Sequence, residues 1–199
     1  MAPLAAVVSY AVPRGRYERH PLRTEIVHPL LIAAALALFV GCGLAFSPGR
    51  AAVAALFCAA LVVVTAADLE YRVVPNRIVV PGSIAVLAAM TAVEPSPEWA
   101  LGAVGASLFL LLAAFLHPKG MGMGDVKLAF LMGAALGRTV PVALAVAMVA
   151  ALVPSLALLV RHGTAARKMG IPYAPFLALG SVVALFAGEP LLDAYLSRF

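Results

Sequence analysis

The sequence predicts an all-α protein, a polytopic bundle of transmembrane helices. Of its 199 residues, 64% are hydrophobic and only 12% are charged, whereas roughly a quarter of the residues in soluble domains are charged. The mean hydropathy is +1.04, and apolar runs follow one another along most of the chain. We count about seven such runs, at residues 30–46, 51–67, 78–93, 101–116, 126–137, 140–160 and 174–188.

The length of each run indicates whether it can cross a bilayer. A spanning helix needs about 17 to 25 mostly apolar residues, and most of the runs are near that length. The fifth run is short unless the glycine-rich loop before it dips into the membrane or its helix continues past Gly137. No cleavable secretory signal is expected, because a polar segment with four arginines separates Met1 from the first run. We divide the chain into a basic cytoplasmic tail, residues 1–29, and a transmembrane domain, residues 30–199.

The distribution of lysine and arginine predicts the orientation. These residues favour the cytoplasmic side of short loops. Eleven of the 14 lie in the N-terminal tail and in the second, fourth and sixth connections, whereas Arg50, Arg138 and Arg198 lie on the other side. We therefore expect a multi-pass protein of the inner (plasma) membrane with a cytoplasmic N-terminus and an external C-terminus.

Other features of the composition argue against several classes of protein. Cys42 and Cys58 both lie in apolar runs and form no Cys-x-x-Cys pair, so neither a zinc site nor a disulfide framework is indicated. The four histidines show no metal-ligand spacing. Membrane topology accounts for the net charge of +5, and no nucleic-acid-binding motif accompanies it. We expect membrane lipids as partners, and no metal, cofactor or nucleic acid.

Two aspartates lie at the ends of apolar runs on the predicted cytoplasmic side. Asp68 ends the second run within TAADLEYRVVPNRIVVPG, where Pro75-Asn76 stops the helix and restricts Val74 to extended geometry. Asp125 opens the fifth run within KGMGMGDVKLAF, where the alternating glycines allow close backbone approach. Asp125 can then lie at a helix N-terminus, where the helix dipole favours its charged form. The two carboxylates therefore share one membrane face.

Two facing carboxylates are what peptide hydrolysis by an aspartyl mechanism requires. One ionised group withdraws a proton from water, while its protonated partner hydrogen-bonds the scissile carbonyl and later helps to protonate the leaving amine. Like charges a few ångströms apart resist simultaneous ionisation, so the pair tends to share one proton. Intramembrane carboxylates also mark ion paths, so a small proton- or cation-coupled transporter that uses the same aspartates is the alternative.

Three segments carry a resemblance to a known family. DLEYRVVPN, GMGDVKLAF and IPYAPFLALG resemble the signature segments of type IV prepilin peptidases, the Gly-x-Gly-Asp class of membrane aspartyl proteases. The resemblance implies cleavage of prepilin or pseudopilin precursors, proteins of type IV pili and secretion, after a glycine at the cytoplasmic face. It maps the catalytic aspartates to Asp68 and Asp125. A relationship to signal-peptide peptidases, another group of Gly-x-Gly-Asp proteases, is not supported. This chain lacks the Tyr-Asp and Pro-Ala-Leu pairings expected of that group.

The sequence departs from the larger members of that family in two places. Those members carry a cysteine-paired cytoplasmic domain and also N-methylate the new terminus, so this chain resembles the short, peptidase-only members. Ala174 stands where a glycine is common in the third segment.

Residues around the two aspartates are expected to support the site. The supporting loop residues are Gly122, Gly124, Lys127, Pro75 and Asn76. Lys127 either stabilises the charge of Asp125 or anchors its loop to lipid headgroups, and we expect Glu70 to be a solvated loop residue. Gly133 and Gly137 form a small-xxx-small pair that predicts close helix packing.

Overall fold

The structure, a computed structural model, describes residues 7–8, 10–12, 24–116, 122–163 and 171–198. These residues are almost entirely helical and contain no β-strand. The helices are α2 (Thr24–Ala45), α3 (Pro48–Tyr71), α4 (Asn76–Val93), α5 (Glu98–Leu116), α6 (Met123–Leu136), the 3₁₀ turn η1 (Gly137–Thr139), α7 (Val140–His162) and α8 (Ala174–Leu196). The predicted all-α class is confirmed, and each of the seven apolar runs corresponds to one α-helix of this set.

Five helical stretches in the described part of the chain are long and apolar enough to cross a membrane. Four are α3, α4, α5 and α8, and the fifth is the continuous stretch Met123–Arg161. The expected shortness of the fifth run is confirmed: α6 has 14 residues, and η1 joins it to α7. The count of seven spans and the cytoplasmic N-terminus stay predictions, and most of the predicted basic tail lies outside the described residues, together with Lys119, Arg167 and Lys168.

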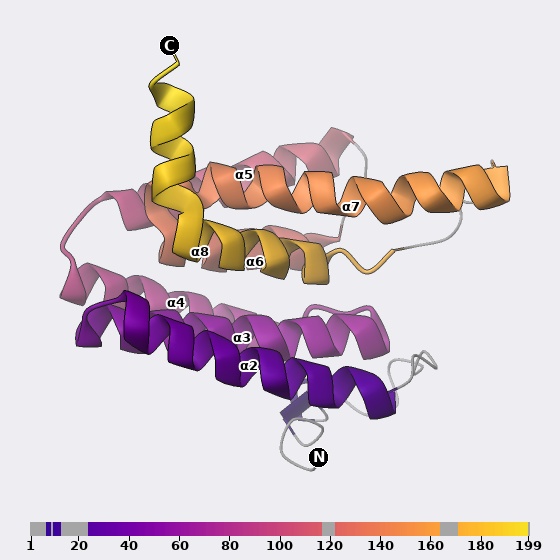
Figure 1. The fold of residues 1–199 in the computed structure, drawn as a ribbon, viewed down its shortest axis with the longest axis horizontal. Helices are drawn as coiled ribbons and strands as arrows, with labels where there is room; N and C mark the ends of the chain where they lie inside the picture. Colours follow the sequence, from indigo (N-terminus) through magenta and orange to yellow (C-terminus); the bar gives the residue numbers. More distant parts are fainter. Residues whose placement is uncertain (1–6, 9, 13–23, 117–121, 164–170, 199) are drawn as a thin grey trace.

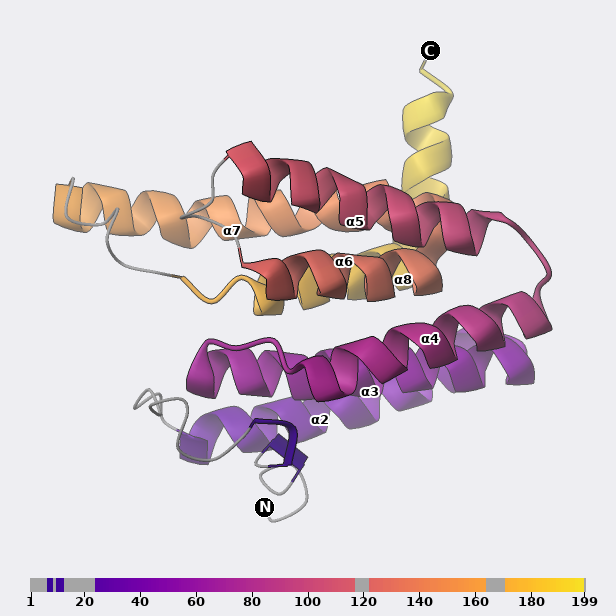
Figure 2. The same cartoon turned by 180° about the vertical axis from the view of Figure 1, so that it is seen from behind.

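The helices form two groups that lie side by side (Figure 1). One group contains α2, α3 and α4, the other contains α5, α6, α7 and α8, and the view from behind shows the same division (Figure 2). Contacts of α4 with α6 and of α3 with α8 join the groups. The C-terminal part of α8 turns away from the bundle, and α8 contains Pro190, which removes a backbone hydrogen bond and kinks a helix.

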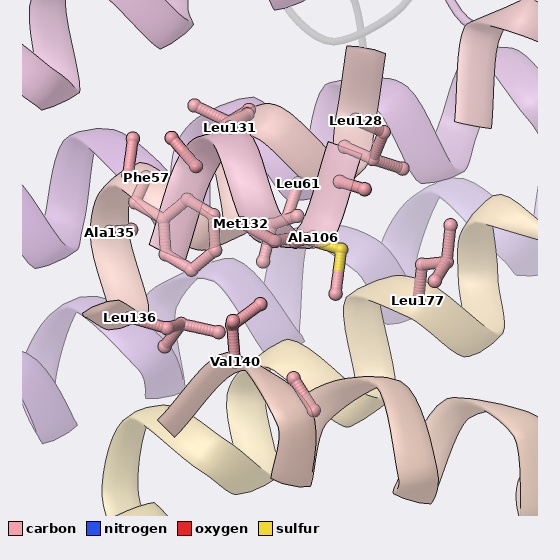
Figure 3. Close-up of a cluster of buried hydrophobic side chains, with 14 of the residues drawn as sticks. Phe57, Leu61, Ala106, Leu128, Leu131, Met132, Ala135, Leu136, Val140 and Leu177 are labelled. Atoms are coloured by element: carbon pink, nitrogen blue, oxygen red, sulfur yellow. The ribbon is translucent and has the colours of Figure 1, made fainter. Parts of the chain in front are cut away.

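The core lies where the two groups meet (Figure 3). Phe57 and Leu61 of α3 pack near Leu131 and Met132 of α6, and all four side chains are almost completely buried. Leu177 of α8 belongs to the same cluster. This cluster lies between the middle of α3, the second half of α6 and the N-terminal part of α8.

Glycines set the closest helix contacts, as the small-xxx-small pair predicts. The backbone of Gly133 on α6 lies directly against Gly102 of α5, and a Cβ on Gly102 would lie 2.7 Å from the Gly137 carbonyl oxygen. Gly137 has a φ of 54°, a left-handed conformation that ends α6 at this point. The prediction of tight packing at Gly133 and Gly137 is therefore confirmed.

Candidate active site

Asp68 lies in the last turn of α3 and is 6% exposed. The helix ends at Tyr71, because Arg72 adopts a left-handed conformation with φ 53° and its N–H donates to the Asp68 carbonyl oxygen at 2.9 Å. Three residues without regular secondary structure follow, of which Pro75 is extended, and α4 begins at Asn76.

Asp125 lies in the first turn of α6, the predicted helix N-terminus. Its Oδ2 accepts a hydrogen bond from the Gly122 N–H at 3.3 Å, and its own N–H donates to the Gly122 carbonyl oxygen at 3.1 Å. This reciprocal pair caps the helix, since it satisfies N–H groups that have no partner within the first turn. The Asp125 carboxylate is consequently fixed by its own loop.

A third helix end meets Asp68. The N–H of Ala174, the first residue of α8, donates to Asp68 Oδ2 at 3.1 Å in a buried environment. This N–H belongs to the first turn of α8, where backbone donors need an outside acceptor and the helix dipole favours a negative charge. Asp68 therefore lies beside the start of α8, and the loop that carries Asp125 packs against the loop that follows Asp68.

Two contacts hold the Asp125 loop against the Asp68 loop. A Cβ at Gly124 would lie 2.7 Å from Cβ of Val74 and 3.1 Å from its Cγ2, so only glycine fits without movement. Lys127 Nζ donates to Asn76 Oδ1 at 3.0 Å across the same junction. The Lys127 side chain thus joins α6 to the start of α4. This contact explains its position without either of the two roles expected for it.

Tyr173 is the residue that immediately precedes α8, and it is half-buried beside Asp125. Burial, and then the negative charge of Asp125, raise the pKa of the Tyr173 phenol above its ordinary value. The hydroxyl therefore stays protonated through the neutral range and remains a hydrogen-bond donor next to the aspartates.

The predicted supporting residues lie at the junction of the two loops. They are Gly122, Gly124, Lys127, Pro75 and Asn76. The expectation for Glu70 was wrong: it lies in the last turn of α3 and is 6% exposed, because the helix continues to Tyr71. Sequence reasoning also missed the Ala174 N–H and Tyr173. The only signal for them was their place in the third resembling segment.

Comparisons with known proteins identify the family of the chain. The model of the type IV leader peptidase family matches residues 55–156, which include both aspartates. A prepilin leader peptidase/N-methyltransferase of Bacillus subtilis is 28% identical, and the match covers 98% of this chain and 80% of that protein. A Burkholderia pseudomallei protein of the same name is 33% identical over 92% of this chain and 62% of its own length.

A third relative with the same name comes from Aeromonas salmonicida. It is 27% identical, and the match covers 96% of this chain and 68% of that protein. No solved structure matches significantly. The family model covers half of the chain and includes both aspartates, and on these grounds the chain belongs to the type IV leader peptidase family.

Proposed function

We propose that this protein is a membrane aspartyl endopeptidase that removes the leader of prepilin or pseudopilin precursors at the cytoplasmic face, with Asp68 and Asp125 as its catalytic dyad. The observation that supports the proposal is the packing of the two loops that carry these aspartates, through Gly124 against Val74 and Lys127 against Asn76. Membership of a peptidase family supports hydrolysis over the ion-transport alternative, which would use the same residues.

The dyad acts on a water molecule and the scissile carbonyl. The ionised carboxylate takes a proton from water as the water oxygen bonds to the carbonyl carbon, and the protonated carboxylic acid hydrogen-bonds the carbonyl oxygen. The tetrahedral intermediate then collapses, the C–N bond breaks, and the proton taken from water passes to the leaving amine. Both carboxylates already accept a backbone N–H, from Ala174 and from Gly122, and these bonds hold the oxygens in place during the reaction.

The charges near the site support cleavage at the cytoplasmic face. Arg72, Arg77 and Lys127 lie at the aspartate end of the bundle, whereas Arg50 and Arg138 lie near the opposite helix ends. Because lysine and arginine favour the cytoplasmic side, the dyad is accessible from that side. A precursor whose apolar helix lies in the bilayer beside the protein would present the bond before that helix at this level.

Replacement of each aspartate by asparagine tests the proposal. We expect Asp68→Asn and Asp125→Asn each to abolish cleavage of a co-expressed prepilin-type substrate, because an amide can neither accept the proton from water nor share one. Glu94→Gln is the matched control: it makes the same carboxylate-to-amide change at the far end of the bundle, where Glu94 pairs with Arg50 at 3.2 Å. The variants should reach the membrane in normal amounts, and normal processing by either aspartate variant would exclude the dyad.

A further inference from the structure

A groove of about 550 Å³ lies on the face of the bundle between α5 and α7, away from the aspartates. Its walls are almost entirely apolar, and its lining includes Gly105 of α5 and Ala145 of α7. Apart from the neighbouring part of α5 itself, no heavy atom of the described residues lies within 4 Å of the position that a Cβ on Gly105 would occupy. The glycine at this position therefore widens the groove, and no close helix contact requires it.

The length of the groove matches one leaflet of a bilayer. It follows α5 from Glu98 to Phe109 and α7 from Val140 to Met148. At 1.5 Å per residue, the α5 wall is about 16 Å long, which is about half of the roughly 30 Å hydrocarbon core. A lipid acyl chain from one leaflet fits this length, whereas a transmembrane helix would extend past it.

Charged groups gather at one end of the groove only, the end opposite the aspartates. Arg138 lines the groove there and pairs with Glu189 of α8. Glu98 lines the same end. The two carboxylates of Glu98 and Glu189 with the one guanidinium of Arg138 give this rim a net negative charge, which attracts a cationic group and repels an anionic one.

We propose that the groove binds the acyl chain of an amine-bearing zwitterionic phospholipid, with its ammonium group near Glu98 and its phosphate near Arg138. Lipid tails are as apolar as the groove walls, so hydrophobic transfer does not select the occupant. Selection comes from the shape of the hollow and from the headgroup. A primary ammonium can donate hydrogen bonds to a carboxylate, and the acidic rim disfavours a headgroup with net negative charge.

The single tryptophan of the chain provides a reporter for this site. Trp99 is 3% exposed, and its ring packs against Gly137, which lines the charged end of the groove. The purified protein is reconstituted in phosphatidylcholine vesicles that contain increasing fractions of dibrominated phosphatidylethanolamine or dibrominated phosphatidylglycerol. Bromine quenches tryptophan fluorescence at short range, so a bound brominated lipid quenches Trp99 at a lower mole fraction than random mixing predicts.

With phosphatidylethanolamine we expect more quenching than random mixing predicts. With phosphatidylglycerol we expect no such excess. Gly105→Phe fills the hollow and should remove the excess, whereas Gly43→Phe, at a site on α2 with equally open surroundings among the described residues, should retain it. Glu98→Gln should weaken the preference for the amine without filling the groove. Random quenching by both lipids, or stronger quenching by phosphatidylglycerol, would overturn the proposal.

Native mass spectrometry of the purified protein separates the lipid from other occupants. We expect one phospholipid per chain, lost in Gly105→Phe. A dimer of the chain that Gly105→Phe dissociates would assign the groove to a second copy. Cross-linking of a prepilin-type substrate to a photoreactive group at Gly105 would assign it to the precursor helix, and either outcome would refute lipid binding.

Discussion

Substitution of Gly124 by alanine tests whether the contact between the two loops sets the spacing of the aspartates. The added Cβ would lie 2.7 Å from Cβ of Val74, whereas carbon atoms in contact are normally about 3.5 to 4.0 Å apart. The two loops must therefore separate by about 1 Å, and a displacement of that size at a reacting centre lowers the rate about a hundredfold. Because Asp125 directly follows Gly124, we expect this loss in kcat for Gly124→Ala.

Stability should change much less than activity. Alanine stabilises a helix by about 0.5 to 1 kcal/mol relative to glycine, and overpacking destabilises by about 1 to 3 kcal/mol, so the two effects partly cancel at Gly124 in the first turn of α6. The matched control is Gly43→Ala on α2, where no described heavy atom lies within 4 Å of the added carbon. Cleavage rates with a co-reconstituted substrate and thermal unfolding in detergent would be measured for both variants.

A second substitution identifies the cause of the loss. Val74→Gly removes the atom that the new Cβ meets, so Gly124→Ala/Val74→Gly should recover most of the activity, whereas Val74→Ala leaves the close Cβ in place and should recover little. If Gly124→Ala cleaves at the wild-type rate, or if Val74→Gly gives no recovery, the contact does not determine the spacing of the dyad.

Three further predictions concern the rim of the site, the topology and the reaction product. Lys127→Met removes the exposed hydrogen bond to Asn76; we expect a loss of stability below about 1 kcal/mol and a severalfold lower kcat, measured in the same two assays. In a cysteine-free background, Met123→Cys, at a position that is 58% exposed, should react with an impermeant thiol reagent only in inverted vesicles, and Pro95→Cys only in intact cells. In an assay with these 199 residues as the sole processing activity, intact mass of the processed substrate should show a free N-terminal amine, because their two cysteines, Cys42 and Cys58, form no Cys-x-x-Cys pair; a gain of one methyl group that depends on this chain would contradict this.

Apolar runs predicted the helices well because length and hydrophobicity are properties of the segment itself. Their ends were less predictable: α2 begins at Thr24, six residues before the first run, and α8 continues past Gly188 to Leu196. The end of α3 illustrates the reason. Arg72 closes this helix in a left-handed conformation that usually favours glycine or asparagine, so the tertiary contacts of this loop override the local preference of the residue.

The candidate site was predictable where it depends on side chains. Asp68, Asp125 and the glycines before Asp125 are unusual residues at the ends of apolar runs, and their types indicate their chemistry. The donor to Asp68 is the backbone N–H of Ala174, and any residue other than proline carries such a group. The Ala174 N–H can take this role because α8 begins at Ala174 and lies next to α3. Neither fact can be predicted from the sequence of α3 or of α8 alone.

Helix association in a bilayer explains why the site depends on such close contacts. Lipid surrounds the helices with hydrocarbon, so burial of apolar side chains contributes little to holding one helix against another, and packing and hydrogen bonds must position them. Each aspartate is correspondingly fixed by a different helix: the carboxylate of Asp68 on α3 is held by α8, and that of Asp125 is held by the loop of α6. The contact between Gly124 and Val74 joins these two units. A change that moves only α8 should therefore misplace Asp68 and leave Asp125 capped, so activity can be lost while both loops keep their structure.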